Sequence, residues 1–214
     1  MKHAAVKRLE EIRRALDAHY GELTCPLEHE TPFQLLVAVL LSAQCRDDRV
    51  NEVTKGLFLV APDARSMAKM SQEELEAHIK TLGLYRAKAA NLLKTAAILS
   101  DEYQNEVPRT MEQLTALPGI GRKSANVILG NAFGLPGFPV DTHVTRLANL
   151  LELVDTDVPE KIEREITPFV PPEEWANFSH QLIQLGRDFC TARKRNCSAC
   201  PLRDCCPAVG ARKK

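Results

Sequence analysis

The 214-residue sequence has no apolar stretch long enough to cross a lipid bilayer. Its longest apolar run, residues 35–41, has seven members, whereas a transmembrane helix needs roughly 20. The sequence also has no secretory signal at its start, because Met1-Lys2-His3 leads directly into a charged segment without an apolar core. We therefore expect a soluble, cytoplasmic protein that has no membrane partner.

The sequence shows no compositional bias, and its one internal similarity, between residues 82–89 and 118–125, is too short to be more than weak support for a duplication. Its 10 Gly and 13 Pro are scattered, which excludes collagen-like and low-complexity chains. The content of 44% hydrophobic and 26% charged residues is typical of a folded globular chain, so extensive disorder is excluded as well. The length suits one or two domains.

Signals for β-structure are also missing, because no segment alternates polar and apolar residues and no Asn-Gly or Asp-Gly turn occurs. Apolar residues recur at helical spacing instead, which predicts an all-α fold. We expect helices near residues 5–19, 32–44, 49–60, 71–82, 85–100, 110–116, 122–133, 142–151, 159–167 and 172–186. Capping boxes at Ser71 and Thr110 mark two of the starts, and residues 35–41 should form the centre of the core. Residues 135–139, rich in Pro and Gly, are the best candidate for a boundary between two lobes.

The sequence has no excess of positive charge, since 28 basic residues balance 28 acidic ones. A net charge of zero argues against a nucleic-acid partner at first sight. However, residues 151–185 hold eight acidic and two basic residues, and residues 186–214 hold eight basic and two acidic ones. The neutrality is therefore a cancellation between two neighbouring segments, and we expect the basic one to face phosphate.

The number of cysteines is odd, and five of the seven lie in the last 25 residues. An odd count without a secretory signal is poor support for a disulfide framework. The spacing Cys190-x6-Cys197-x2-Cys200-x5-Cys206 supplies four thiolates from 17 residues, which suits zinc or an iron–sulfur cluster and does not decide between them. Cys205 can replace Cys206 as the fourth ligand on chemical grounds.

A glycine-rich turn is the second chemical signal, and it reads Leu117-Pro118-Gly119-Ile120-Gly121-Arg122-Lys123. Such a turn before a helix start can bind phosphate through backbone N–H groups, or it can be an ordinary corner between helices. Lys123 stands where the helix dipole favours a nucleophilic amine, although an ordinary exposed lysine fits equally well. Asp141 is expected to cap a helix, and a rigid carboxylate can also assist proton transfer.

The combination of these motifs resembles the endonuclease III family of DNA glycosylases. The resemblance rests on the glycine-rich turn, on Val140-Asp141-Thr142-His143-Val144 and on the cysteine spacing, and it covers nearly the whole chain. Further matching segments are Leu40-Leu41-Ser42-Ala43-Gln44, Gly83-Leu84-Tyr85 and Ala125-Asn126-Val127.

The resemblance implies two helical lobes with a DNA cleft between them. A helical barrel domain with a helix-hairpin-helix motif would span residues 24–135, and residues 1–23 with 136–214 would form an iron–sulfur cluster domain. The implied activity is removal of oxidised pyrimidines from duplex DNA, followed by strand cleavage at the abasic site. The protein is expected to act as a monomer in the cytoplasm, associated with the nucleoid if bacterial.

The resemblance also implies a role for each motif residue. Lys123 would form a Schiff base with the sugar, and Asp141 would support base loss and proton movement. Side chains that fill the gap left by the flipped nucleotide, or that contact DNA elsewhere, would be Gln44, Leu84, Gly119, Ile120, Gly121, Arg122 and His143. The ligands of one four-iron four-sulfur cluster would be Cys190, Cys197, Cys200 and Cys206.

Three alternatives remain at this point. The adenine-removing branch of the family has the same fold and cluster, but it lacks the hairpin lysine that Lys123 matches. A DNA-binding or redox-sensing iron–sulfur protein without catalysis is disfavoured by the presence of both Lys123 and Asp141. A zinc-stapled interaction module would be colourless, whereas a cluster protein is yellow-brown. Cys45, which follows Gln44 directly, is expected to be buried and not catalytic.

Overall fold

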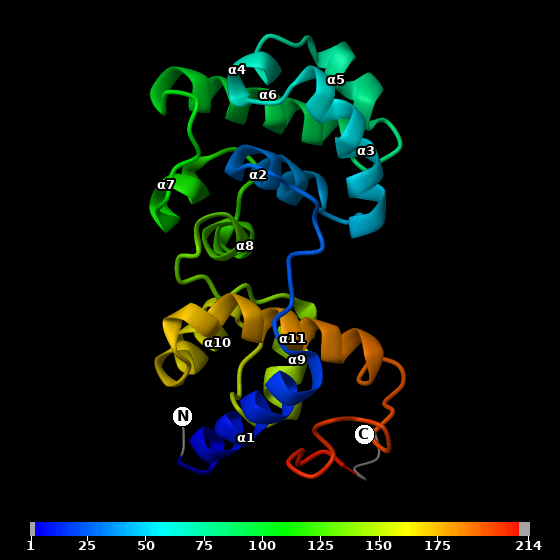
Figure 1. Ribbon diagram of the computed structural model, residues 1–214, viewed down its shortest axis with the longest axis vertical. Coiled ribbons are helices and arrows are strands. Elements are labelled where there is room, and N and C mark those ends of the chain that lie inside the picture. Colours follow the sequence, from blue (N-terminus) through cyan, green and yellow to red (C-terminus); the bar gives the residue numbers. More distant parts are fainter. Residues whose placement is uncertain (1–2, 210–214) are drawn as a thin grey trace. The chain divides into compact units, whose positions relative to one another are not determined.

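A computed structural model describes residues 3–209, and in that range the chain is helical, with a single isolated β-bridge between Cys190 and Arg195 (Figure 1). The chain divides into two compact units. Unit 2 comprises residues 25–135, and unit 1 comprises residues 1–24 together with 136–214. Among the described helices, none is both long and apolar enough to span a membrane.

Unit 2 is built around one helix that is apolar on nearly all sides. This helix, α2 (Pro32–Leu41), has eight of its ten residues buried and packs against α3, α6 and α8. Thr31 caps its start by accepting the N–H of Gln34, and Pro32 occupies the first turn, where a missing N–H costs nothing. The remaining helices of unit 2 are α3 (Asp47–Val60), α4 (Ala64–Met67), α5 (Gln72–Ile79), α6 (Tyr85–Glu102), α7 (Met111–Ala116) and α8 (Arg122–Phe133). The predicted central position of residues 35–41 is therefore confirmed.

Unit 1 joins the two ends of the chain around a separate core. The N-terminal helix α1 (His3–Tyr20) packs on α11 (Trp175–Asp188), which also contacts α9 (Thr142–Leu150). The core includes Phe138 and Phe178, whose rings stack with centroids 6.1 Å apart. The other helical segments are α10 (Pro159–Ile166), η1 (Thr167–Phe169) and η2 (Pro172–Glu174). The final described segment, residues 189–209, contains turns and no helix.

The all-α fold class is confirmed, but several helix boundaries differ from the prediction. The first core helix stops at Leu41 rather than Gln44, because the chain turns into a left-handed conformation at Gln44, with φ of 56°. The short helix α4 escaped prediction, since four residues are too few for a periodic signal. The predicted helix over residues 172–186 is a 3-10 turn followed by α11, which continues to Asp188.

The two predicted capping boxes have different outcomes. Ser71 and Glu74 form a complete box, in which each side chain bonds the backbone N–H of the other residue. Thr110 only accepts the N–H of Gln113, while the side chain of Gln113 bonds the threonine hydroxyl at 2.9 Å. The second box is therefore wrong, because the glutamine side chain is already engaged by the hydroxyl.

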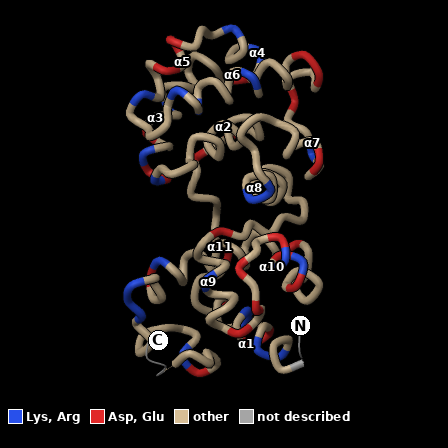
Figure 2. Tube along the Cα trace, turned by 180° about the vertical axis from the view of Figure 1, so that it is seen from behind, with Lys and Arg blue, Asp and Glu red and all other residues tan. Residues whose placement is uncertain are grey.

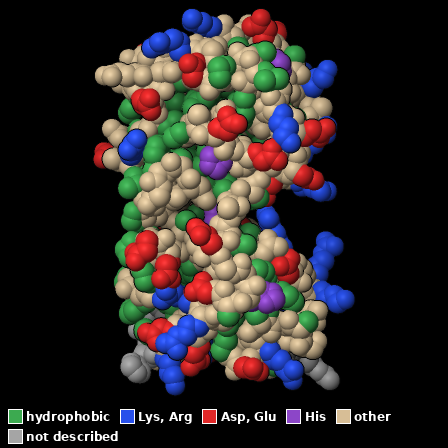
Figure 3. Space-filling model, viewed as in Figure 1, with side chains coloured by type: hydrophobic (Ala, Val, Ile, Leu, Met, Phe, Trp, Pro, Cys, Tyr) green, Lys and Arg blue, Asp and Glu red, His purple; other side chains and the backbone are tan. Residues whose placement is uncertain are grey.

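The charged segments are less uniform than their net charges suggest. Part of the acidic segment neutralises arginines of α1, since Arg8 pairs with Glu152 and Arg13 pairs with Glu174. Basic residues are grouped on the chain that follows α11 (Figure 2). On the face shown in Figure 3, charged side chains of both signs are interspersed on each unit. Arg212, Lys213 and Lys214, which contribute to the predicted basic segment, lie outside the described residues.

Candidate functional site: a glycine hairpin, two strained turns and a cysteine-lined hollow

The glycine-rich turn lies between α7 and α8 in unit 2. Gly119 has a φ of +82°, which side-chain-bearing residues rarely adopt, and a Cβ there would lie 2.9 Å from the amide nitrogen of Asn91. The hydroxyl of buried Thr95 donates to the carbonyl of Pro118 at 3.2 Å. The turn is therefore held from behind by α6, and glycine is required at position 119 by both conformation and space.

The exposed side of this turn consists of the start of α8. Gly121, Arg122 and Lys123 are all exposed, and no side chain caps the helix. A helix start without a side-chain cap can bind an anion through its first N–H groups. Ile120, in contrast, is only 4% exposed, so its side chain anchors the turn in the core and only its backbone is available for a ligand.

Lys123 stands in the first turn of α8, near two groups that the sequence analysis did not connect with it. Burial raises the pKa of the Cys25 thiol, while the nearby charges of Asp47 and Lys123 act on it in opposite directions. Asp47 begins α3, so helices α3 and α8 bring a carboxylate and an amine toward the same thiol. In the sequence, Asp47 and Asp48 look only like the acidic first turn of a helix.

Asp141 lies in unit 1 and caps α9, where its carboxylate accepts the N–H of Val144 at 2.8 Å. The predicted capping role is therefore confirmed. The residue also lines a surface hollow together with Thr145, Asn149 and Asp157. The carboxylate is thus held rigidly by the helix while it remains partly exposed, as an acid–base group requires.

His143 is held close to a glycine of α11 that the sequence analysis did not single out. A Cβ at Gly186 would lie 2.7 Å from Nδ1 of His143 and 3.2 Å from Nη2 of Arg146. Gly186 is therefore required for the close approach of α9 and α11. Arg146 also lies 3.8 Å from the sulfur of Cys190, which links α9 to the cysteine segment.

Gln44 and Leu84 occupy two exposed turns of unit 2 and share a rare conformation. Their φ angles are 56° and 59°, and Leu84 is 60% exposed. A left-handed conformation at a non-glycine residue costs about 1–3 kcal/mol, and exposure of a leucine forfeits its burial. Strain combined with exposure is typical of residues kept for binding, although Gln104, Asn105 and Glu152 share the left-handed conformation.

Lys88 and Cys45 connect the turn at Gln44 with the turn at Leu84. Lys88, on α6, is only 4% exposed, and its ammonium donates to the sulfur of Cys45 at 3.1 Å. Cys45 directly follows Gln44, and the backbone N–H of Lys88 donates to the carbonyl of Leu84. No sequence signal connected Lys88 with Cys45, because 43 residues separate them.

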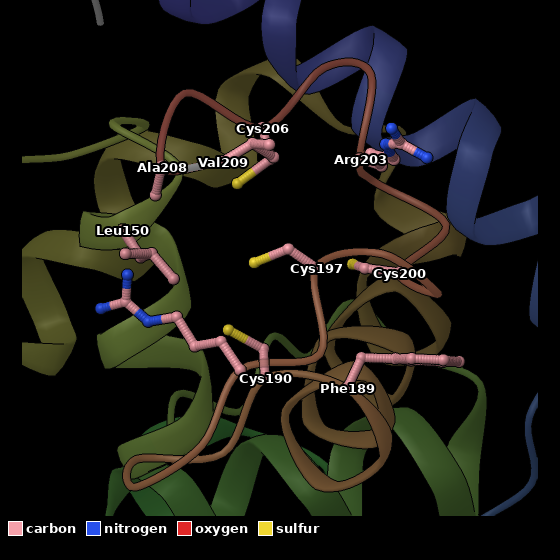
Figure 4. A pocket seen from close by; sticks show the side chains of 10 residues that line it. Leu150, Phe189, Cys190, Cys197, Cys200, Arg203, Cys206, Ala208 and Val209 are labelled. Carbon is pink, nitrogen blue, oxygen red and sulfur yellow. The ribbon is translucent and has the colours of Figure 1, made fainter. Parts of the chain in front are cut away.

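Four of the C-terminal cysteines of unit 1 line a common hollow: Cys190, Cys197, Cys200 and Cys206. The sulfurs of Cys190, Cys197 and Cys206 point toward one another, with Cys200 beside Cys197 (Figure 4). Cys205 does not line this hollow, and its thiol lies 3.6 Å from the carbonyl of Leu202 instead. The geometry therefore favours Cys206 over Cys205 as the fourth ligand.

The electrostatics of this hollow favour a positively charged occupant. Burial, together with smaller contributions from the neighbouring Cys190, Cys206 and Cys197, raises the pKa of Cys200 to about 11. Burial likewise raises the pKa of Cys206, with a further contribution from Cys190 and Cys197. Four thiolates this close together repel one another, so they need a cation or a metal cluster to be stable.

The donor set fits a cluster better than a single ion. One tetrahedral zinc ion needs each sulfur about 2.3 Å away from it, and within residues 3–209 no group of three or more metal-binding side chains converges on one ion position. An iron–sulfur cluster is larger, so its four thiolates stand farther apart around a shared space. Cys190, Cys197, Cys200 and Cys206 line one shared hollow, as the ligands of such a cluster would.

The structure thus gathers the predicted residues in two sets. The hairpin, Gln44, Leu84 and Lys123 belong to unit 2, whereas Asp141, His143 and the four cysteines belong to unit 1. Within unit 2, three exposed turns present an amine, an uncapped helix start and two strained side chains. This is a suitable arrangement for a phosphate backbone and a displaced base.

Comparisons with known proteins assign this arrangement to a family. Residues 37–172 match the family model described as HhH-GPD superfamily base excision DNA repair protein. Endonuclease III of Synechocystis sp. is 45% identical over 206 residues, which cover 96% of this chain and 94% of that protein. A solved non-covalent endonuclease III–DNA complex superimposes with a TM-score of 0.86 at 41% identity, over 93% of this chain and 95% of that one. A trapped endonuclease III–DNA covalent intermediate gives a TM-score of 0.84 at 41% identity, with the same coverage.

Proposed function

The chain belongs to the endonuclease III family of HhH-GPD base excision repair DNA glycosylases, and on that premise we propose that it removes oxidised pyrimidines from duplex DNA and then cleaves the strand through a Schiff base on Lys123. The observation that carries the proposal is an exposed amine at the uncapped start of α8, directly after the glycine hairpin. The covalent DNA intermediate described for a 41% identical relative supports it. The protein acts as a monomer in the cytoplasm.

The hairpin holds the DNA backbone near the lesion. The N–H groups at the start of α8 and the backbone around Gly119 and Gly121 bind a phosphate without reading sequence. Arg122 adds a positive charge at the same place, and His143 contacts the strand from unit 1. The fixed backbone holds the sugar within reach of Lys123.

Gln44 and Leu84 fill the space that the damaged nucleotide leaves. A flipped nucleotide costs a few kcal/mol of lost stacking, and side chains inserted into the gap offset part of that cost. Both residues are exposed in turns of fixed left-handed conformation, so little further ordering is needed on binding.

Lys123 carries the chemistry in two steps. Its amine attacks C1′ of the sugar, a C1′–N bond forms as the bond between C1′ and the base breaks, and the damaged base leaves with a proton. The C1′–O4′ bond then breaks, O4′ takes the second proton of the amine, and the opened sugar is joined to Lys123 as an imine. Loss of a C2′ proton then breaks the C3′–O bond, so the strand is cut by β-elimination. The carboxylate of Asp141, fixed at the start of α9, supports base loss and carries protons.

The four cysteines of the C-terminal segment hold one four-iron four-sulfur cluster. Cys190, Cys197, Cys200 and Cys206 are its ligands, and the hollow that they line supports this assignment. When bound, the cluster supplies the positive charge that the four thiolates need and cross-links a segment without helices. Arg146 extends that support to α9, which Asp141 caps.

Borohydride trapping on a duplex that contains thymine glycol tests the proposal. The wild-type holoenzyme should form a covalent DNA adduct, and Lys123→Ala should form none. Lys94→Ala, which removes an exposed lysine from α6 in the same unit, is the matched control and should form the adduct normally. An adduct that persists in Lys123→Ala, or base removal by the wild type without any adduct, would overturn the role of Lys123.

A further inference from the structure

Cys45 and Lys88 form a thiol–amine pair that the proposed chemistry leaves unused. The ammonium nitrogen of Lys88 lies 3.1 Å from the sulfur of Cys45. Cys45 is partly exposed, and its neighbours Gln44 and Arg46 are both exposed. Cys45 is therefore partly accessible as a residue, and its sulfur contacts a cation.

The environment of Lys88 is unusual for a charged group. Its side chain is 4% exposed, and within the described residues its nitrogen bonds no oxygen and joins no ion pair. A buried ammonium is costly unless an acceptor compensates for lost water, and a thiol is a weak acceptor. The sulfur of Cys45 is therefore the acceptor that faces this buried ammonium.

Reactive cysteines occur in positively charged, partly exposed surroundings, whereas inert ones are buried among apolar groups. The other cysteine of unit 2, Cys25, is also partly buried, and burial raises its thiol pKa. Cys45 differs from it by the ammonium within hydrogen-bond distance. The two thiols thus have different surroundings within one unit.

We propose that Cys45 is an oxidation site for hydrogen peroxide and other small hydroperoxides, with Lys88 as the proton donor. The sulfur, after its proton has passed to solvent, attacks one peroxide oxygen, so an S–O bond forms and the O–O bond breaks. The sulfur is oxidised to a sulfenic acid, and the departing hydroxide takes a proton from the Lys88 ammonium and leaves as water. The amine regains its proton from solvent.

Oxidation at this place acts on the turn that carries Gln44. A sulfenic acid is bulkier than a thiol and replaces the contact that joins the turn to α6, so Gln44 loses its fixed conformation. Binding to damaged duplex DNA then weakens, which makes the pair an oxidant-sensitive regulator. This consequence rests on the proposed function, whereas the oxidation itself does not.

Mass spectrometry with dimedone, a reagent that captures sulfenic acids, tests the oxidation. The holoenzyme is treated with a low concentration of hydrogen peroxide, and capture at Cys45 is compared with capture at Cys25. We expect capture at Cys45 to exceed that at Cys25 by about tenfold or more. Equal rates at the two thiols would overturn the proposal.

Two substitutions of Lys88 separate proton donation from packing. Lys88→Met keeps an unbranched side chain without a charge and should slow capture at Cys45 about tenfold, whereas Lys88→Arg keeps a cationic donor and should retain most of it. Retained thermal unfolding temperatures establish that the variants are folded. If capture in folded Lys88→Met equals that of the wild type, Lys88 has no role.

Duplex binding before and after peroxide tests the regulation. Wild-type affinity for an abasic-site duplex should fall about tenfold after treatment, while Cys45→Ser should bind normally and keep its affinity. Iron content, measured in both proteins, corrects for any loss of the cluster. An equal loss of affinity in Cys45→Ser overturns the regulation. Absence of glycosylase activity in the untreated wild type contradicts the proposed function and leaves the dimedone result intact.

Discussion

Unit 2 and the C-terminal segment of unit 1 are stabilised in different ways. Unit 2 encloses α2, a helix whose residues 35–41 are all buried, so apolar burial is the main contribution to its stability. The segment at residues 189–209 has turns, a single β-bridge and one fully buried leucine, Leu202. In the function proposed above, the group held by its four thiols takes the place of such a core. A region can thus be ordered by burial or by a bound group, and the two respond to different perturbations.

Loss of a cluster ligand should lower stability more than any of the other substitutions, and the effect should be confined to unit 1. Cys197→Ser removes one of four thiolates, so the protein should lose its iron and residues 189–209 should become sensitive to protease, because metal binding and folding are coupled there. The loss should exceed the about 2–5 kcal/mol of a typical core truncation. Iron analysis and limited proteolysis measure it. Cys205→Ser is the control and should keep its iron. If Cys205→Ser lost its iron and Cys197→Ser kept it, Cys205 and not Cys197 would be a ligand.

A core truncation in unit 2 should come next. Leu36 is fully buried in α2, so Leu36→Ala should lower the free energy of unfolding by about 2–5 kcal/mol and leave the iron content unchanged. Urea denaturation followed by circular dichroism gives the value. Leu59→Ala, at an 86% exposed position on α3, should change stability by less than about 0.5 kcal/mol. Similar losses in both variants would contradict the description of α2 as the core.

A pair of matched helix caps compares structural and functional roles across the units. Thr31→Ala in unit 2 and Asp141→Ala in unit 1 should each cost about 1 kcal/mol, because each side chain accepts a backbone N–H. Asp141→Asn keeps a good cap without the charge, so stability should be retained while base removal is lost. Thermal unfolding and glycosylase assays measure the two effects. Full activity in Asp141→Asn would show that Asp141 only caps α9 and has no role in base removal.

The smallest effect concerns the pH dependence of another cap. Hydrogen bonds from Ser66 lower the pKa of Asp63 at the start of α4, so its contribution to stability is present above the unfolded pKa of about 3.9 and is lost as the pH falls through the lower folded value. The stability difference between wild type and Asp63→Ala should therefore shrink below about pH 4. Urea midpoints at several pH values measure it. If the stability difference between wild type and Asp63→Ala stayed constant with pH, the contribution of Asp63 would come from packing and not from its charge.

Most elements of the fold could be predicted because their signals are local. The apolar run at residues 35–41, the capping box at Ser71 and the proline at the start of α2 each determine a helix from neighbouring residues. The helix α8 was predicted with both of its ends, since Gly121 and Gly134 flank it. The end of α2 was not, because the left-handed turn at Gln44 has no glycine to mark it.

The candidate site could be predicted only where its residues are adjacent in sequence. The hairpin and the cysteine spacing are continuous motifs, so their positions followed from the sequence. The contact of Cys45 with Lys88, the approach of Gly186 to His143 and the charges of Asp47 and Lys123 around Cys25 are absent from any local pattern. Each joins two elements that are distant along the chain.

The sequence by itself determined the helical class, the hairpin and the four thiols, because spacing along the chain is enough to specify each of them. Only the tertiary structure decided that Cys206 rather than Cys205 lines the hollow, that Ile120 is buried while its neighbours are exposed, and that a buried ammonium faces Cys45. The physical reason is that burial and charge depend on what packs against a residue. That neighbour comes from another helix, whose approach no local pattern encodes.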